Sequence, residues 1–133
     1  MAFAALPGQA HAQSITTIAG TGTYSNTLNG DGGQATAASV GSLRALAYDA
    51  NGNLYFSENS AVRKISSTGV LTTIAGGNTP GNSGDGGLAT NALISNIKAL
   101  AIDSVGNIYI SIGNETLPHV PRTESISYRS SPA

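Results

Sequence analysis

The motif NGDGGQAT at residues 29–36 returns as SGDGGLAT at residues 83–90, 54 positions later in a chain of 133 residues. Shifting residues 30–57 onto 84–111 by the same 54 positions gives 15 identical pairs out of 28. Self-similarity at a fixed spacing is typical of repeat architectures. We therefore predict that the chain contains two copies of one structural unit.

A second repeated segment sets the bounds of these units. The letters TTIAG occur at residues 16–20 and again at 72–76, with an offset of 56. The two-residue difference falls between TTIAG and GDGG, and such insertions collect in loops. We predict a repeat region at residues 13–111, with units at about 15–70 and 71–111.

Apolar runs separated by turn signals predict four strands in the first unit, at residues 42–49, 53–58, 61–66 and 70–76. Apolar side chains occupy both alternating faces of the first two strands, so this sheet needs cover on both sides. Like sheets stacked around an axis meet that need. The predicted fold is all-β: an incomplete β-propeller of four-stranded antiparallel blades, about one and a half to two of them.

Asp and Gly mark the turns of this predicted sheet. The hairpins DANGN and DSVGN each begin with an aspartate that can accept bonds from the backbone, and each holds a glycine that tolerates positive φ. The GDGG loops have the same conformational freedom. The predicted structural turn residues are Asp49, Gly52, Asp103, Gly106, Gly30, Gly32, Gly33, Gly84, Gly86 and Gly87.

The ordered motifs resemble the NHL-repeat β-propeller family, in its bacterial exported type with GDGG loops. The matching strings are ITTIAGTG, GDGGQATAA, DANGNLY and VRKI in the first unit, and TTIAGG, GDGGLATNA and DSVGNIY in the second. The second unit departs from the pattern because Ile112 stands where the first has Glu58, and no VRKI follows. The resemblance implies a propeller of six or a similar number of blades that acts mainly as a ligand-binding scaffold.

Composition narrows the classes of partner. Charged residues make up 10% of the chain and the formal net charge is −1, so no strong basic surface is available for nucleic acid. Aromatic residues are 5% with no Trp, which disfavours base stacking. There is no Cys, and no apolar run approaches the length of a membrane span. We expect neither a nucleic-acid partner nor a membrane span.

The two ends of the chain lie outside the repeat. Residues 1–12 are apolar and small, with Ala10, His11 and Ala12 in the A-x-A form of a signal-peptidase site. They are predicted to be a truncated signal peptide of an extracytoplasmic or secreted, bacterial protein; the alternative is a disordered Ala-rich terminus. Residues 112–133 carry three prolines and are predicted to be a disordered or frame-shifted tail that does not continue the blade. A partner-binding arm is the alternative for this tail.

Candidate ligand-binding residues follow from the repeated loops, which would lie at equivalent corners of adjacent blades. They are Asn29, Asp31, Ser83, Asp85 and Arg63. A structural role for the loops, with Asp31 capping turn amides, is the competing interpretation. Calcium is possible but weakly supported, because each loop offers one carboxylate where a calcium site collects six to eight oxygens. For Arg63 and Lys64, a solvated strand face or an ion pair with Glu58 worth under ~1 kcal/mol is expected.

No catalytic residue, metal ligand or cofactor is predicted. The first functional hypothesis is a non-catalytic binding scaffold for protein or carbohydrate, within a larger exported protein. The second is part of a propeller lyase or hydrolase with a metal in its central channel, although the innermost strands offer only Arg44 and Lys98. The third is a self-associating repeat or adhesin, which would bind further repeats or copies of itself.

Overall fold

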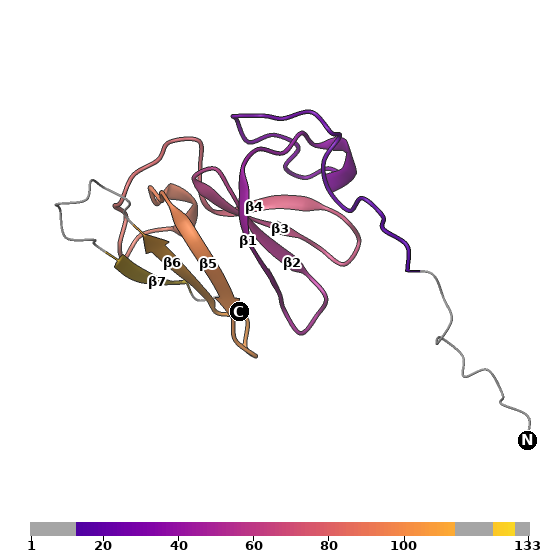
Figure 1. Ribbon diagram of the computed structural model, residues 1–133. Coiled ribbons are helices and arrows are strands. Elements are labelled where there is room, and N and C mark those ends of the chain that lie inside the picture. Colours follow the sequence, from indigo (N-terminus) through magenta and orange to yellow (C-terminus); the bar gives the residue numbers. More distant parts are fainter. Residues whose placement is uncertain (1–12, 114–123, 130–133) are drawn as a thin grey trace, which may run out of the picture.

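The first sheet contains the four strands that the first repeat unit predicts. The computed structural model describes residues 13–113 and 124–129. In it, β1 (Leu43–Tyr48), β2 (Leu54–Glu58), β3 (Ala61–Ile65) and β4 (Leu71–Gly76) pair as antiparallel neighbours in chain order (Figure 1). The predicted four-stranded antiparallel blade is therefore confirmed, and both ends of every strand lie within one residue of their predicted positions.

The first two strands of the second sheet repeat the pairing of β1 with β2 at an offset of 54 residues. The second sheet comprises β5 (Ile97–Ile102), β6 (Ile108–Gly113) and β7 (Glu124–Arg129), again antiparallel and in chain order. Leu46 of β1 lies opposite Phe56, and Leu100 of β5 lies opposite Ile110. Two like sheets side by side confirm the all-β, incomplete propeller fold (Figure 1).

Strand β7 corrects the expectation that the blade stops before the tail. It pairs along the whole of β6, from Gly113 opposite Glu124 to Ile108 opposite Arg129. The prolines do not interrupt it, because they stand at positions 118, 121 and 132, outside residues 124–129. Residues 112 and 113 of the predicted tail end β6, whereas residues 114–123 and 130–133, like the predicted signal peptide at 1–12, lie outside the described part of the chain.

The two sheets pack face to face through apolar side chains. We call the side of each sheet that carries Leu46 or Leu100 its front face, and the side that carries Tyr55 or Tyr109 its back face. The front face of the second sheet packs on the back face of the first. The buried residues of this cluster are Tyr55, Val62, Ala75, Ile94, Ile97, Ile108, Ile110 and Ile112.

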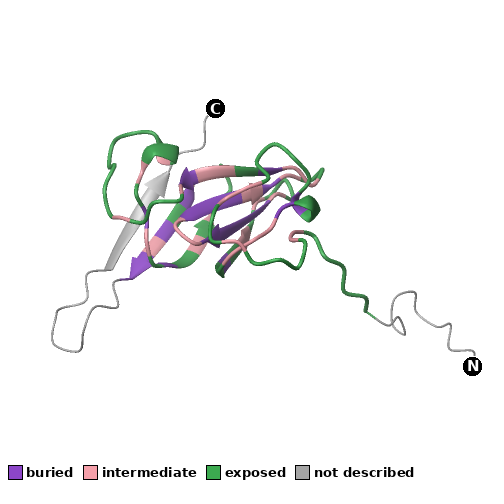
Figure 2. Ribbon diagram, turned by 90° about the horizontal axis from the view of Figure 1, so that it is seen from above, coloured by how far each residue is buried: buried purple, intermediate pink, exposed green. Residues whose placement is uncertain are grey.

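The segment before β1 covers part of the front face of the first sheet. It contains the short 3-10 helix η1 (Ala35–Ala37), and Ala35 and Ala38 are buried against a second cluster. That cluster also contains Leu54, Phe56, Ile65 and Leu71. A matching helix, η2 (Ala89–Asn91), precedes β5. Buried residues are thus concentrated in the strands, and the connecting loops are mostly exposed (Figure 2).

Residues 16–20 repeat the last five letters of β4 but do not form a strand. Ile15 is 101% exposed and Ile18 is 51% exposed, while Ala19 packs against the front-face cluster. Because the same letters form β4 in the first sheet, the repeat favours the fourth strand of a preceding blade here. A strand needs a ladder partner, and the described residues provide none beside this segment.

Within residues 13–113 and 124–129, the structure contains no helix with the length and apolar character of a membrane span.

Candidate functional site

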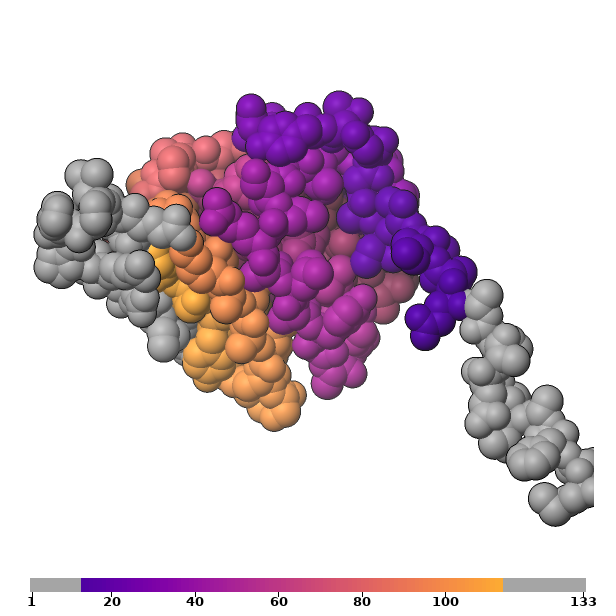
Figure 3. Space-filling view, in the orientation of Figure 1, coloured from indigo at the N-terminus to yellow at the C-terminus, as the bar shows by residue number. Residues whose placement is uncertain are grey.

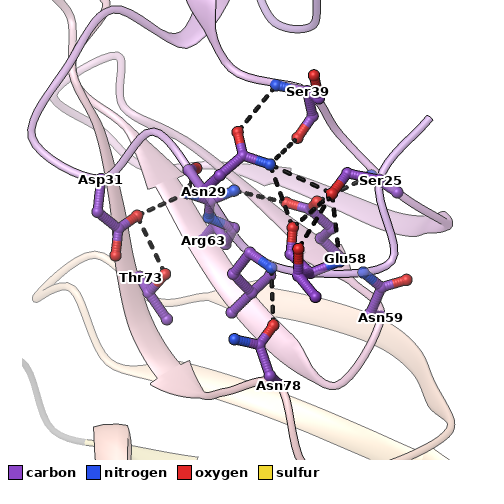
Figure 4. Close-up of polar contacts among 12 residues, drawn as sticks. Ser25, Asn29, Asp31, Ser39, Glu58, Asn59, Arg63, Thr73 and Asn78 are labelled. Atoms are coloured by element: carbon purple, nitrogen blue, oxygen red, sulfur yellow. Dashed lines mark hydrogen bonds and ion pairs between the residues drawn. The ribbon is translucent and has the colours of Figure 1, made fainter. Parts of the chain in front are cut away.

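Arg63 is the centre of a polar network beneath the first GDGG loop. It lies on β3 opposite Phe56, which places it on the front face, and its side chain is 0% exposed. Nη1 donates to Glu58 Oε2 at 2.8 Å, and Nη2 donates to Asp31 Oδ1 at 2.6 Å. Nη2 also donates to the carbonyl oxygen of Asn29 at 2.5 Å (Figure 4). The guanidinium therefore joins the strand β3 to both β2 and the loop.

Glu58 is the fully buried partner of this network, at the end of β2. Oε2 accepts the bond from Arg63, and Oε1 accepts a bond from the backbone N–H of Gly41 at 2.8 Å. A buried carboxylate is stable only when its charge is paired and its oxygens accept hydrogen bonds, and both conditions are met. The pair holds the segment before β1 against the end of β2.

This burial corrects the sequence-based expectation for Arg63. We expected a solvated face or an ion pair worth under ~1 kcal/mol. The strand alternation instead places Arg63 and Glu58 on the same face as Leu54 and Phe56, and the GDGG loop covers that face. A contact between residues 31 and 63 is set by tertiary packing, so local sequence does not reveal it.

Asp31 connects the loop to two strands. Its side chain is 51% exposed, and Oδ1 accepts bonds from Arg63 and from Thr73 Oγ1 of β4 at 3.1 Å. The backbone around it is tied to β4 as well: Gly32 N–H donates to Leu71 O at 2.8 Å, and Leu71 N–H donates to Gly33 O at 2.9 Å. Asp31 therefore bonds strand side chains, in place of the turn amides that the sequence suggested.

The side-chain amide of Asn29 closes the loop through hydrogen bonds to the backbone of Ser39. Its Oδ1 accepts from the N–H of Ser39 at 3.0 Å, and its Nδ2 donates to the carbonyl oxygen of Ser39 at 3.0 Å. Nδ2 also approaches Thr27 O and Ser25 Oγ, at 3.1 and 3.3 Å (Figure 4). The amide is thus occupied by internal bonds that close the loop of residues 29–39.

The second GDGG loop has the same letters but different surroundings. Ser83 and Asp85 are exposed, and Ser83 exchanges two backbone bonds with Leu93. In the second sheet, Ser127 takes the register position of Arg63, opposite Ile110, and Ile112 takes that of Glu58. The buried ion pair therefore has no counterpart there, and no bond to Asp85 occurs among the described residues. Of the five candidates, Asp31, Ser83 and Asp85 lie at the surface.

The glycines of both loops separate into two kinds. Gly30, Gly32, Gly84 and Gly86 have positive φ, between 78° and 108°. Gly33 and Gly87 do not share that conformation; each donates its N–H to the carbonyl oxygen of the first glycine of its loop, at 3.0 and 3.1 Å. The first and third letters of GDGG are thus the ones for which the backbone favours glycine.

Asp49 and Asp103 head two matching turns between paired strands. Asp49 Oδ1 accepts from the N–H of Asn51 and of Asn53, both at 2.9 Å, and Oδ2 accepts from Asn53 Nδ2 at 2.7 Å and Tyr55 Oη at 3.1 Å. Partial desolvation acts to raise the pKa of Asp49, but these hydrogen bonds together hold it below its ordinary value. Asp103 repeats the pattern, with its pKa lowered in the same way.

The remaining charged candidates do not form a recognisable metal centre. No group of three or more His, Cys, Asp or Glu residues that could hold an ion occurs within residues 13–113. Arg44 of β1 and Lys98 of β5 are exposed on the innermost strands. The expectation of no cofactor, with calcium at the loops as a weakly supported alternative, is not tested by these residues.

A family model described as the teneurin NHL domain matches residues 9–82, more than half of the chain. The chain belongs to the teneurin NHL domain family. The match includes the first GDGG loop and all of β1 to β4, and hence the Asp31, Arg63 and Glu58 network. This establishes the NHL repeat that the motifs indicated. The bacterial exported type stays a prediction.

Similar proteins are vertebrate teneurins. Teneurin-1 of Gallus gallus is 38% identical over 71 residues, which cover 50% of the chain and 3% of that protein. Teneurin-1 of Homo sapiens is 38% identical over 65 residues, and Teneurin-3 of Mus musculus 35% over 65, each covering 46% of the chain and 2% of the relative. The chain therefore spans a very small part of these relatives, and they give no support to a bacterial origin.

Proposed function

We propose that this chain is a non-catalytic NHL propeller module that binds protein through the front face of its first sheet. The observation that carries this proposal is a row of large apolar side chains on β1 that face solvent. Leu43, Leu46 and Tyr48 are 50%, 65% and 64% exposed. They lie opposite Glu58, Phe56 and Leu54 in the register, so all three share the front face.

A row of this kind indicates a binding surface. Single exposed apolar residues are ordinary, but apolar side chains grouped on one face mark interaction sites. Fully burying a side chain of this size is worth about 1.5–3 kcal/mol. Tyr48 adds a hydroxyl that can bond to a partner at the edge of the contact.

The buried ion pair supports a scaffold in preference to an enzyme. Arg63 is a ligand-binding candidate in the sequence, yet Arg63 and Glu58 are both 0% exposed and bonded to each other. Their bonds hold a loop in place, so they rigidify the surface that a partner would meet. The alternative of a propeller lyase or hydrolase needs a metal in the central channel, and a bound carbohydrate is a second alternative ligand.

The proposal includes an extracytoplasmic location within a larger exported protein. The A-x-A pattern at residues 10–12 supports export. The vertebrate relatives are far longer than this chain, which supports a larger parent protein. The exposed Asp31, Ser83 and Asp85 form a secondary surface for polar contacts at the blade corners.

Binding can be tested with matched lysine variants of two exposed apolar residues. The chain is immobilised and exposed to the secreted proteins of the organism that produces it, and retained proteins are quantified by mass spectrometry. Leu46→Lys should reduce specific retention by ~tenfold or more, because it buries a charge at the contact. Val105→Lys is the control, since Val105 is 75% exposed at the turn between β5 and β6.

The same preparation distinguishes the alternatives. A glycan array that shows saturable binding, with no protein retained, would replace the protein partner by a carbohydrate. Metal analysis that finds a stoichiometric ion in the purified chain would favour the propeller enzyme. Equal retention by Leu46→Lys and the unmodified chain would remove the front face from the proposal.

A further inference from the structure

The turn between β1 and β2 contains one of the two Asn–Gly steps in the sequence. Asn51 is followed by Gly52 in this turn, and Asn29 is followed by Gly30 in the first GDGG loop. Asparagine is a thermolabile residue. An Asn–Gly step is prone to spontaneous deamidation, because glycine has no side chain that hinders the approach of its backbone nitrogen to the asparagine side chain. The structure places the two steps in different surroundings.

The side chain of Asn51 is unconstrained. Asn51 and Gly52 are both exposed, and no hydrogen bond to the side-chain amide of Asn51 occurs among the described residues. A Cβ on Gly52 would meet nothing within 4 Å, so the backbone at this position has space to move. Figure 3 shows the magenta end of the first sheet, which contains this turn, projecting at the lower edge of the molecule.

The side chain of Asn29 is held in place. Its Nδ2 donates to the carbonyl oxygen of Ser39 and its Oδ1 accepts from the N–H of Ser39, both at 3.0 Å. The next residue is closely packed, since a Cβ on Gly30 would lie 2.6 Å from the Cβ of Ala38. Before the nitrogen of Gly30 can reach Cγ of Asn29, the amide has to rotate away from Ser39, which breaks at least two hydrogen bonds.

Deamidation at Asn51 requires no reactant except water. The backbone nitrogen of Gly52 loses its proton and forms a bond to Cγ of Asn51. The bond from Cγ to Nδ2 breaks, and Nδ2 leaves with that proton as ammonia, so the product is a cyclic succinimide. Water then opens the ring. Cleavage of the bond from the ring nitrogen to Cγ gives aspartate, and cleavage of its bond to the backbone carbonyl carbon gives isoaspartate.

We infer that Asn51 is a site of spontaneous deamidation in the folded protein, and that Asn29 is protected from the same reaction. The selectivity comes from the fold, since both steps consist of the same two residue types. The reaction adds one negative charge to a chain whose formal net charge is −1, and it does so two residues from Asp49. Isoaspartate also lengthens the backbone of the turn by one carbon atom.

The second blade has a turn of the same kind without the reactive amide. Its letters DSVGN place Val105 where the first blade has Asn51. Asp103 Oδ1 accepts from the N–H of Val105 at 3.1 Å, as Asp49 Oδ1 does from the corresponding N–H. The glycine of each turn has positive φ, 82° in the first and 91° in the second. Asn51→Val therefore removes the reactive group and is compatible with the turn.

The experiment incubates the full, folded chain near neutral pH and follows both Asn–Gly steps by peptide mass spectrometry. Trypsin cleaves after Arg44 and Arg63, so residues 1–44 contain one step and residues 45–63 contain the other. Fragmentation of the second peptide locates the change at Asn51, and a sample digested at time zero corrects for deamidation during digestion. Asn51 should convert ~tenfold or more faster than Asn29, because its amide has no hydrogen bonds to break first.

Two controls connect this selectivity to the fold. In guanidinium chloride, where the fold is lost, the two Asn–Gly steps should convert at similar rates. Anion exchange should resolve a more acidic species that accumulates in the unmodified chain and does not accumulate in Asn51→Val. Circular dichroism should show the same strand content in both chains. Asn51→Gln replaces the valine variant if the latter does not fold, since glutamine cyclises far more slowly.

The outcomes separate clearly. Equal conversion of the two steps in the folded chain overturns the inference, and so does faster conversion at Asn29. A folded chain in which Asn51 stays intact, under conditions where the unfolded chain converts it, overturns the inference as well. None of these outcomes involves a bound partner, so the proposed protein binding is decided by its own experiment.

Discussion

Arg63 and Glu58 place two opposite charges inside the first blade, where losing one partner is costly. Glu58→Gln leaves the half-exposed Asp31 as the one carboxylate paired with the buried guanidinium among the described residues, so we expect a loss of about 3 kcal/mol or more in the free energy of unfolding. Asp31→Asn should cost about 1 kcal/mol or less, because water screens that carboxylate. Urea denaturation measures both. Equal losses would show that the burial of Glu58 is not what sets the cost.

The second blade has uncharged residues at the same register positions. It has Ile112 in place of Glu58, and Ser127 at the register position of Arg63. Replacing a whole buried ion pair by apolar residues is often neutral or stabilising. We therefore expect Glu58→Ile combined with Arg63→Met to be more stable than Glu58→Gln alone in the same urea experiment. A double variant that is less stable than the single one would show that the loop depends on the guanidinium itself.

Asp49 and Asp103 give the fold a dependence on acid. Desolvation acts to raise the pKa of each aspartate, but hydrogen bonds to the two carboxylates keep both pKa values below the ordinary value of 3.8. A folded-state pKa below the unfolded one adds stability that is complete above about pH 5 and is lost as the pH falls through the folded pKa. At pH values below about 4, the melting temperature should therefore decrease. It should decrease less steeply in the double variant Asp49→Asn with Asp103→Asn. An unchanged slope in that double variant would assign the acid sensitivity to other carboxylates.

The sequence predicts the surroundings of Asp49 better than those of Arg63, because the contacts of Asp49 are closer along the chain. Asp49 bonds within four residues along the chain and with Tyr55, so the letters DANGN contain most of its environment. Arg63 bonds a loop 32 residues away, and its environment exists only after the sheet and loop have packed. The alternation of Leu54, Phe56 and Glu58 along β2 was the available signal, since it places the carboxylate on an apolar face.

At the scale of elements, strand positions follow from local pattern and strand partners do not. The four strands of the first sheet agree with the apolar runs and glycine turns. Strand β7 was missed because prolines nearby outweighed the alternation of ESISYR, which contains none. Residues 16–20 have the letters of a strand but no ladder partner among the described residues, so they do not form one.

The GDGG loop is packed more tightly at its first glycine than at its third letter. A Cβ on Gly30 would lie 2.6 Å from the Cβ of Ala38, whereas a Cβ on Gly32 would meet nothing within 4 Å. Both residues have positive φ, so Gly32→Ala should cost about 1–2 kcal/mol from the backbone alone. Gly30→Ala adds overpacking and should cost about 1–3 kcal/mol more. Thermal unfolding compares them, and a Gly32→Ala variant that is the less stable of the two would contradict this assignment.

At the scale of the whole molecule, the repeat predicts which faces are alike but not which are occupied. The offset of 54 residues makes Leu46 and Leu100 equivalent in sequence and in register. Only the structure shows that Leu100 has a neighbouring blade and that Leu46 is 65% exposed. A repeat unit gains much of its stability from its neighbours, so burying the exposed front face of the first sheet should add stability to the fold.

Self-association, the third functional hypothesis, would stabilise the folded chain by mass action if it buries the front face. On that hypothesis the melting temperature of the unmodified chain rises with protein concentration, because the unfolded chain has no such surface to pair. In Leu46→Lys the melting temperature should be the same at all concentrations, while Val105→Lys should follow the unmodified chain. Differential scanning calorimetry over a concentration series measures this. A melting temperature independent of concentration in the unmodified chain would mean that the exposed row on β1 serves a partner other than a second copy.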